Sequence, residues 1–528
     1  MYDVVIIGSG VAGSICANEL VKNGLKIAVL DAGHTLQRAD LVLNQLKSGR
    51  DDSMSPYPLL PYTPHPDPIL LKDYPSALKR PYDTSYIRTV GGTTWHWGGA
   101  SWRFLPSDFK LKSNFGVGRD WGIDYQDLEP YYVLAEREMG ISGEEIKQLK
   151  QWRSAPYPLP PVPLSYMDRF IKDKIASANL NLQAEPAARN TKPYDSRPSC
   201  CGSNNCIPIC PVGAQYSAIH TLEKAIKNGV ELIENAVVHR LEDNHKGEIT
   251  TAIYRTPNGK DISIKGKYFI LAANAIESAK ILLMSKTTHS PQGIANSSGL
   301  VGKNLMDHPT VHATFDIEEP VYSGRGPVGI SAITDFMDGD FRKDYAAKKL
   351  AIGNGNFSEI IATEMIDDLQ LTKDFKTQLK HKTIRRIGSH TQHEQLPSLN
   401  NKVTLSATKF DALGLPYPEV TWDVEEYVIK SAEHSVKVYE KLGELLGATK
   451  TKINVNLASN AHMLGTTIMG ADPKTSVVNS DCFSHDHSNL TIAGGAVFPS
   501  SSSVNPTLTV AALSIRLCEK LSLLLKET

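Results

Sequence analysis

The fold of this chain is decided near its N-terminus, where residues 2–13 read Tyr2-Asp-Val-Val-Ile-Ile-Gly8-Ser-Gly10-Val-Ala-Gly13. The β-branched run before Gly8 is typical of a buried parallel strand, and an apolar pattern of helical period follows. Gly8 permits a tight turn, Gly10 lets the backbone approach a pyrophosphate, and Gly13 lets the helix pack against the strand. The stretch therefore predicts strand, turn and helix, with a diphosphate at the helix N-terminus.

A second predicted strand, residues 26–30, ends at Asp31. An acid at this spacing supplies the carboxylate that accepts a hydrogen bond from a ribose hydroxyl. The alternative is a glycine-rich turn that binds nothing. We favour a dinucleotide site because the strand, glycines, helix, second strand and acid all occur in register.

Length and composition set the class of protein. The chain has 528 residues and a mass of 57.9 kDa, enough for two or three structural lobes. A net charge of −1 and a hydrophobic fraction of 41% describe an ordinary globular protein and argue against nucleic-acid binding. No apolar run approaches the ~20 residues of a membrane span, and the first strand leaves no room for a secretion signal. We therefore expect another protein to carry this one if it works outside the cytoplasm.

A glycine-bracketed aromatic segment follows an irregular stretch, residues 41–78, which is rich in Pro, Asp and Ser. The segment reads Gly91-Gly-Thr-Thr-Trp-His96-Trp-Gly-Gly99, so its backbone is expected to pass close to something flat. Without further context, His96 is more simply explained as a core histidine.

Four of the seven cysteines lie within eleven residues, in Cys200-Cys201-Gly-Ser-Asn-Asn-Cys206-Ile-Pro-Ile-Cys210-Pro. Two local disulfides or a structural zinc site are the alternatives, although disulfides suit small secreted scaffolds better than a large protein. The ending Cys-x-x-x-Cys-Pro resembles the last ligand pair of bacterial ferredoxins, which favours iron–sulfur ligation. Adjacent side chains diverge, so three ligands, Cys200, Cys206 and Cys210, fit better than four.

The remaining sequence predicts an α/β protein: a Rossmann-like dinucleotide-binding domain and a discontinuous second domain built on an antiparallel sheet with helices. A strand at residues 231–240 and a strand entering a helix at 267–283 are expected to rejoin the nucleotide-binding sheet. The expected division is residues 1–308 mainly for the dinucleotide-binding domain, with a cluster segment at 197–214, then 309–455 mainly for the substrate domain, and 456–528 for a return to the first domain and the active site.

Several motifs together resemble the glucose–methanol–choline oxidoreductase family. They are the N-terminal glycine block, Gly91-Gly-Thr-Thr-Trp-His96, Asn274-Ala-Ile-Glu-Ser278, Gly302-Lys-Asn-Leu-Met-Asp-His-Pro309, His462 ahead of Gly465-Thr, and Asn505-Pro-Thr-Leu-Thr509. The cysteine block is similar to that of the catalytic subunits of bacterial membrane-associated flavin dehydrogenases, which act on glucose, fructose, gluconate or sorbitol.

This resemblance implies FAD, and it assigns a role to particular residues. Asp31 would hold the adenosine ribose, Val237 would approach the adenine, and the loop from Gly91 to Gly99 would run along the isoalloxazine. At Gly-Gly-x-x-x-His, His96 has the spacing at which some relatives bond the flavin covalently, while others with similar loops do not. The residues assigned to FAD are Gly8, Gly10, Gly13, Asp31, Gly92, Thr94, His96, Gly98, Val237 and Ala496.

The resemblance also implies the reaction, oxidation of a sugar hydroxyl with a glucose-like aldose favoured. His462 would act as the base that removes the hydroxyl proton as hydride leaves carbon, and Asn505 would orient the hydroxyl. As a cap before Pro506, Asn505 has an equally good structural explanation. Close relatives tend to show Asn-Asn-His where this chain has Asn460-Ala-His462, which leaves the sugar undetermined.

The implied electron route is a three-iron (3Fe-4S) cluster at Cys200, Cys206 and Cys210 that passes electrons to a cytochrome or other acceptor. The chain contains no Cys-x-x-Cys-His haem motif, so any haem would belong to a partner. We expect a small companion subunit and a membrane-anchored cytochrome at the periplasmic face of a bacterial inner membrane, or a cytoplasmic protein if no partner exists. The competing hypotheses are an oxidase that uses oxygen and a non-catalytic flavoprotein scaffold.

Overall fold

The β-branched run before Gly8 forms the central strand of a parallel sheet in the computed structural model. Strand β1 (Tyr2–Ile7) pairs with β2 (Ile27–Leu30) on one side and with β7 (Asp261–Leu271) on the other. Strand β4 (Glu231–Ile233) lies beyond β2, and β15 (Leu490–Ile492) pairs with β7. The structure describes residues 1–48, 56–58, 82, 85–368 and 371–527.

Strand β7 belongs to two arrangements at once. Its first half continues an antiparallel meander with β5 (Val237–Asp243) and β6 (Ile249–Arg255), and its second half lies in the parallel sheet. The single strand predicted over residues 231–240 is wrong, because β4 ends at Ile233 and β5 begins at Val237. Between them Asn235 has a positive φ of 53°, which breaks an extended strand.

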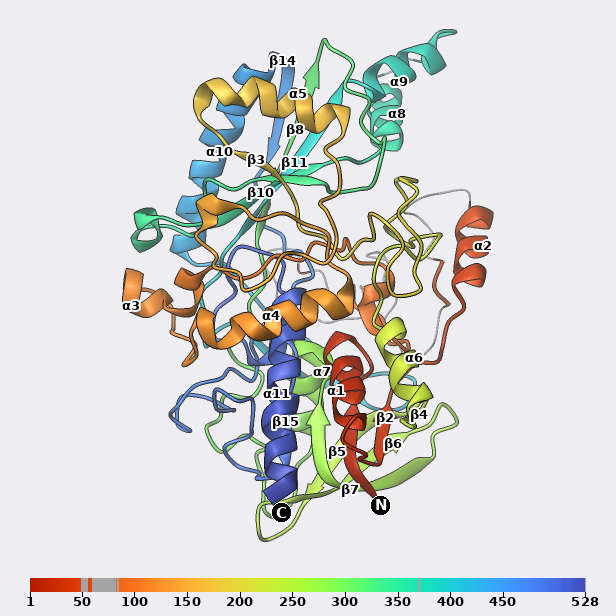
Figure 1. Cartoon of the computed structure of the whole chain (residues 1–528), viewed down its shortest axis with the longest axis vertical. Helices are drawn as coiled ribbons and strands as arrows, with labels where there is room; N and C mark the ends of the chain where they lie inside the picture. Colours follow the sequence, from red (N-terminus) through yellow and green to blue (C-terminus); the bar gives the residue numbers. More distant parts are fainter. Residues whose placement is uncertain (49–55, 59–81, 83–84, 369–370, 528) are drawn as a thin grey trace.

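Three helices pack together beside the parallel sheet, although they come from distant parts of the chain. Helix α1 (Val11–Val21) contacts α6 (Ile219–Lys227) and α11 (Thr507–Glu527), as Figure 1 shows. Helix α4 (Tyr125–Met139) crosses α11, and α7 (Asn274–Met284) packs against β5. The Rossmann-like domain is thus completed by residues near both ends of the chain.

The second sheet is antiparallel and occupies the upper half of Figure 1, as the alternating pattern after residue 309 predicts. Helix α10 (Glu426–Leu446) packs against β8, β11 and β14, and α5 (Tyr166–Ile175) packs beside it. In order across this sheet the strands are β14 (Ala448–Asn454), β8 (Thr310–Ile317), β11 (Arg386–His393), β10 (Lys348–Gly353), β9 (Ser331–Ile333) and β3 (Leu182–Ala184). The chain therefore has the predicted Rossmann-like domain and a second, antiparallel domain.

The remaining helices and strands belong to neither of the two large sheets. The irregular stretch predicted at residues 41–78 begins inside α2, and most of its other residues fall outside the described part of the chain. The other α-helices and strands outside the two large sheets are α2 (Arg38–Ser48), α3 (Leu111–Phe115), α8 (Ser358–Asp367), α9 (Phe375–Thr383) and the hairpin of β12 (Lys402–Phe410) with β13 (Pro416–Thr421).

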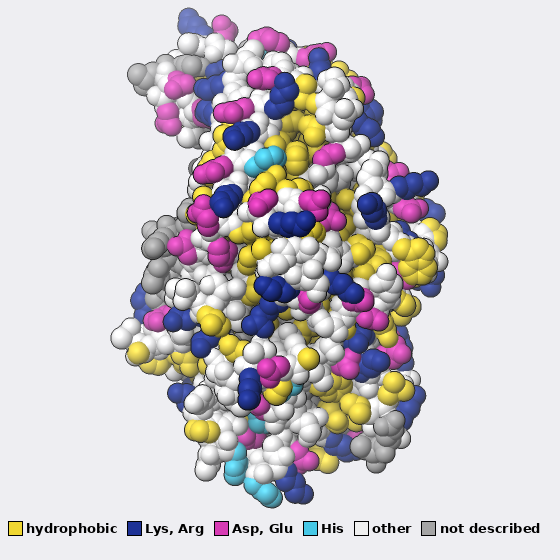
Figure 2. Space-filling model, turned by 90° about the vertical axis from the view of Figure 1, so that its left-hand side faces the viewer, with side chains coloured by type: hydrophobic (Ala, Val, Ile, Leu, Met, Phe, Trp, Pro, Cys, Tyr) yellow, Lys and Arg dark blue, Asp and Glu magenta, His cyan; other side chains and the backbone are white. Residues whose placement is uncertain are grey.

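The surface mixes charges of both signs. On the face in Figure 2, Lys and Arg side chains alternate with Asp and Glu, and hydrophobic side chains lie among them, in keeping with the near-zero net charge. Across the described ranges, the helices include none with the length and apolar character that crossing a bilayer requires.

Candidate active site

A cavity of about 630 Å³ is lined by residues of both sheets. Gly13 and Ala496 do not reach it: Gly13 packs beneath Gly8, and Ala496 is fully buried beside Gly495, which does line the cavity. The predicted residues that line it are Gly8, Gly10, Asp31, Gly92, Thr94, His96, Gly98, Val237, His462 and Asn505.

One end of the cavity has the shape that a diphosphate needs. A Cβ at Gly8 would lie 2.5 Å from the carbonyl oxygen of Ala272, and a Cβ at Gly13 would lie 1.9 Å from that of Gly8. Both positions therefore require glycine. The N-cap of α1 is Gly10, which has no side chain to satisfy the first N–H groups, and these are available to an anion.

Asp31 lies at this end, but its carboxylate is already engaged by the chain. Oδ2 accepts from the Ser9 N–H at 3.0 Å and from the Ser9 hydroxyl, and Oδ1 accepts from the Gly33 N–H at 2.9 Å. Burial raises the pKa of Asp31, and these hydrogen bonds oppose the rise. A ribose hydroxyl would therefore donate to a carboxylate lone pair of Asp31 that Ser9 and Gly33 do not use.

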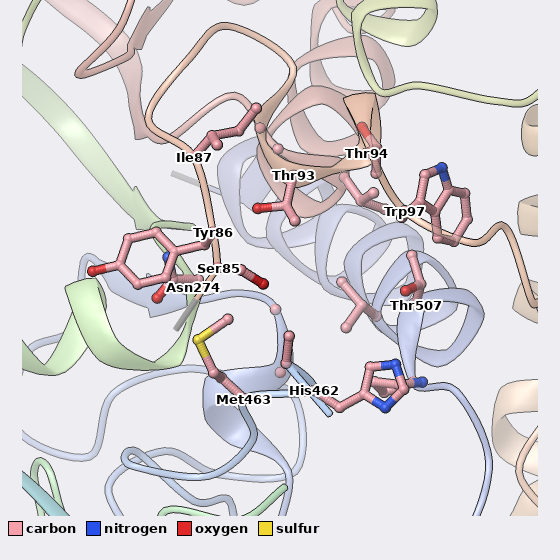
Figure 3. A pocket seen from close by; sticks show the side chains of 18 of the residues that line it. Ser85, Tyr86, Ile87, Thr93, Thr94, Trp97, Asn274, His462, Met463 and Thr507 are labelled. Atoms are coloured by element: carbon pink, nitrogen blue, oxygen red, sulfur yellow. The ribbon is translucent and has the colours of Figure 1, made fainter. Parts of the chain in front are cut away.

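The glycine-bracketed loop lies against the phosphate turn. A Cβ at Gly92 would come within 3.2 Å of the Gly10 Cα, so the absence of a side chain at Gly92 makes this approach possible. The Thr94 hydroxyl accepts from the Ala218 N–H at 2.9 Å, which ties the loop to the start of α6. Trp97 donates its indole N–H to the Tyr216 carbonyl at 2.8 Å. In Figure 3, Trp97 and His462 lie at one end of the cavity, and Tyr86 and Asn274 lie at the other.

The hydrogen bonds of His308 determine the tautomer of His462. His308 Nε2 lies 3.1 Å and 3.0 Å from the carbonyl oxygens of Ser501 and Ser502, which only accept, so this nitrogen carries the proton. In the neutral ring, His308 Nδ1 is then an acceptor. It lies 2.8 Å from His462 Nδ1, which must therefore donate. This leaves Nε2 of His462 unprotonated.

Burial keeps both imidazoles neutral. It lowers the pKa of His308 to about 4, although the hydrogen bonds to the Ser501 and Ser502 carbonyls favour the charged ring and raise the pKa. Burial likewise lowers the pKa of His462 well below its usual 6.5, and the charge of Lys349 acts in the same direction. The backbone N–H of His462 donates to the Asp307 carboxylate at 3.1 Å, which fixes the main chain that carries the ring.

Asn505 connects this histidine to an ion pair. Its amide Nδ2 lies 3.2 Å from His462 Nε2, and its Oδ1 accepts from Lys349 Nζ at 2.5 Å. Lys349 also donates to Glu185 at 2.8 Å. Because ammonium only donates, the lysine fixes the amide with its NH₂ group toward His462. The side chains of His462 and Asn505, predicted to act together, are therefore neighbours.

The three cysteines predicted as ligands carry free thiols. Burial raises the pKa of the Cys200 thiol, a hydrogen bond from the Gly202 N–H and the charge of Arg189 oppose the rise, and Cys206 and Cys210 add to it, so both lie near Cys200. Cys206 Sγ accepts from the buried guanidinium of Arg189 at 3.6 Å. Within the described residues, no three His, Cys, Asp or Glu side chains are arranged as a ready metal site.

Comparison with known proteins settles the family. Residues 170–310 and 397–514 match the family described as GMC oxidoreductase, and residues 6–37 match an NAD(P)-binding Rossmann-like domain. The fructose dehydrogenase large subunit of Gluconobacter japonicus is 42% identical over 97% of this chain and 96% of its own length. The chain belongs to the GMC oxidoreductase family.

Two more distant matches agree with this assignment. The gluconate 2-dehydrogenase flavoprotein of Pantoea cypripedii is 24% identical over 97% of this chain and 92% of its own length. A formate oxidase of Aspergillus oryzae, solved in a study of FAD modification, superposes with a TM-score of 0.65 at 13% identity, covering 100% of this chain and 99% of that one. This structural likeness shows the fold.

As a GMC oxidoreductase, the protein is an FAD-dependent dehydrogenase acting on CH–OH groups, and its cavity fits that cofactor. The glycine turn, the uncapped helix start and the loop at Gly92 form a cradle that side chains would fill.

Sequence reasoning missed the roles of four cavity-region residues, Ser9, His308, Glu185 and Lys349. His308 and Ser9 stand inside recognised motifs, which was an available signal, whereas Glu185 and Lys349 belong to none.

Proposed function

We propose that this GMC oxidoreductase oxidises a hydroxyl of a sugar or sugar derivative. The observation that supports this most directly is the unprotonated Nε2 of His462 at the cavity, held by a hydrogen-bond chain that begins at the carbonyls of Ser501 and Ser502. A base that is neutral and oriented at rest is what oxidation of an alcohol requires.

Oxidation of a CH–OH group removes one hydride and one proton. When bound, FAD supplies the hydride acceptor. His462 takes the hydroxyl proton at Nε2, and its Nδ1–H keeps its bond to His308, so the ring does not turn as it becomes charged. Asn505 Nδ2 donates to the substrate oxygen as negative charge develops there, while Lys349 holds its Oδ1. The carbonyl product then leaves.

We further propose that electrons leave through an iron–sulfur cluster held by Cys200, Cys206 and Cys210. The donor set supports this: the three thiols are free, Cys206 and Cys210 both act on the pKa of Cys200, and the Arg189 guanidinium lies beside Cys206, where it would stabilise thiolate charge. Such a cluster supplies one-electron transfer.

The likeness to a protein named as a large subunit supports a companion subunit. We therefore propose that the protein acts with such a subunit and a membrane-anchored cytochrome at the periplasmic face of the inner membrane.

Anaerobic addition of sugars to the purified, FAD-loaded protein tests the reaction. We expect the yellow flavin absorbance to bleach with at least one sugar and to return with an artificial electron acceptor. Formation of hydrogen peroxide when air is readmitted, at a rate matching turnover, would instead identify an oxidase. A flavin that no sugar or simple alcohol bleaches would refute catalysis at this site.

A further inference from the structure

The wall of the cavity beside Asn505 is built by one face of the antiparallel sheet. Lys349 on β10 is the cross-strand partner of Gln392 on β11, and Ala351 is the partner of His390 two residues further along. Residues two apart on a strand share a face, so these four side chains lie on one surface. All four line the cavity.

Two of the polar groups on this wall form a buried ion pair. The Lys349 side chain is 1% exposed and the Glu185 side chain 8% exposed, with Nζ and Oε2 2.8 Å apart. Separating such a pair in the protein interior is costly, because either charge alone would be buried without compensation. Lys349 and Glu185 therefore enter the cavity wall as one electrically neutral unit.

The charges around the pair are few. Burial lowers the pKa of His390 to about 3, and His462 is likewise neutral. The other charged side chains that line the cavity are Asp31, which accepts from Ser9 of the glycine turn, and Arg88, which is paired with Glu277 at 2.8 Å. Among the described residues, the catalytic end therefore has no net charge to offer a substrate.

Gln392 gives this wall an acceptor that the chain leaves unused. The side chain is 3% exposed, and its Oε1 has no hydrogen-bond partner within the described structure. A buried carbonyl oxygen without a partner costs roughly 1–3 kcal/mol, so it is a position where a ligand donor is favourable. A hydroxyl of a bound sugar is a donor of that kind.

We propose that the Lys349–Glu185 pair makes this enzyme selective for neutral sugars and polyols over sugar acids, with Gln392 accepting a hydroxyl of the substrate. The proposal rests on the proposed function. A sugar acid bound here would place its carboxylate beside a lysine already neutralised by Glu185, so its charge would be desolvated without a free cation. A neutral polyol loses only hydroxyl hydration, which the wall replaces.

The test removes one charge and keeps the shape. Glu185→Gln retains an acceptor for Lys349 but leaves the lysine ammonium without a counter-charge. The variant should therefore bind a substrate carboxylate more tightly. We expect the ratio of kcat/KM for D-gluconate to that for D-fructose, measured with an artificial acceptor, to rise at least about tenfold. An unchanged ratio in an FAD-loaded Glu185→Gln protein would overturn the proposal.

Two further variants separate charge from general disturbance. Asp316→Asn removes a carboxylate paired with Arg386 at 2.7 Å on the same sheet, outside the cavity lining, and should leave the ratio unchanged. Glu185→Gln combined with Lys349→Gln is neutral again and should lose the gain for gluconate, whatever its absolute rate. A gain that persists in the double variant, or one that Asp316→Asn reproduces, would refute a charge effect.

Binding measurements keep the proposal testable where turnover fails. If Glu185→Gln does not retain FAD, the test uses binding to the wild-type protein instead. We expect D-glucitol to bind at least about tenfold more tightly than D-gluconate, with binding measured by the change in the flavin absorption spectrum. Equal affinity would overturn the proposal. If no sugar bleaches the wild-type flavin, the proposed function fails, and the same spectra still decide whether the cavity discriminates by charge.

Discussion

His308 should control catalysis without touching the substrate, through the tautomer of His462. Replacing it by Leu removes the acceptor 2.8 Å from His462 Nδ1 and leaves a buried N–H without a partner. Losing such a partner costs about 1–3 kcal/mol. The ring can relieve this cost only by moving, or by placing its proton on Nε2, where it no longer acts as a base.

If losing this hydrogen bond raises the activation free energy by that amount, kcat should decrease roughly 10- to 100-fold, because each 1.36 kcal/mol is a factor of ten. KM should change little, since substrate binding does not use His308. The assay is steady-state turnover with an artificial acceptor, alongside FAD content from the visible spectrum.

His308→Asn is the matched control, because its side-chain oxygen can accept from His462 Nδ1 at nearly the same position. We expect it to recover most of the rate. A Leu variant with kcat within about twofold of wild type, or an Asn variant as slow as the Leu variant, would refute the tautomer argument.

The other predictions concern the base, the flavin bond and the cysteines. His462→Ala should lower kcat at least ~10²-fold with FAD content intact, and near-normal turnover would contradict its role. Activity requires neutral His462, whose pKa burial lowers well below 6.5, so kcat/KM should stay constant as pH falls through 6.5; a half-loss at 6.5 would contradict this. Acid precipitation tests a covalent bond at His96, since colour left entirely in the supernatant means none. Cys206→Ser should still show sugar-dependent bleaching of the flavin but should no longer reduce a cytochrome. A wild-type protein that contains no iron would refute the cluster proposal.

The sequence predicts this fold well where the determinants are local. The strand, the glycines of the turn and Asp31 lie within one continuous stretch, and close backbone contacts require glycine at Gly8 and Gly13. The alternation after residue 309 likewise predicts an antiparallel sheet. Prediction fails at 231–240, where apolar residues on both sides of Glu234-Asn235 predict one strand, although the positive φ of Asn235 breaks it.

The candidate site is less accessible to sequence reasoning because its hydrogen bonds join distant segments. His308 and His462 are 154 positions apart, and Lys349 and Asn505 are 156 apart. Nothing near Lys349 in the chain indicates that it fixes an amide, since this depends on how β10 is placed against the start of α11. Motif resemblance located His462 and Asn505, but their tautomer and orientation required coordinates.

The shared strand β7 and the late arrival of β15 and α11 have a consequence for synthesis on the ribosome. The N-terminal βαβ unit emerges first, yet β7 keeps an unpaired edge until residues 490–492 are made, and α1 lacks its neighbour until residues 507–527 follow. Unpaired edges recruit other chains. A nascent chain halted between residues 271 and 490 should therefore depend on a chaperone, and nonsense products ending there should be degraded or aggregate.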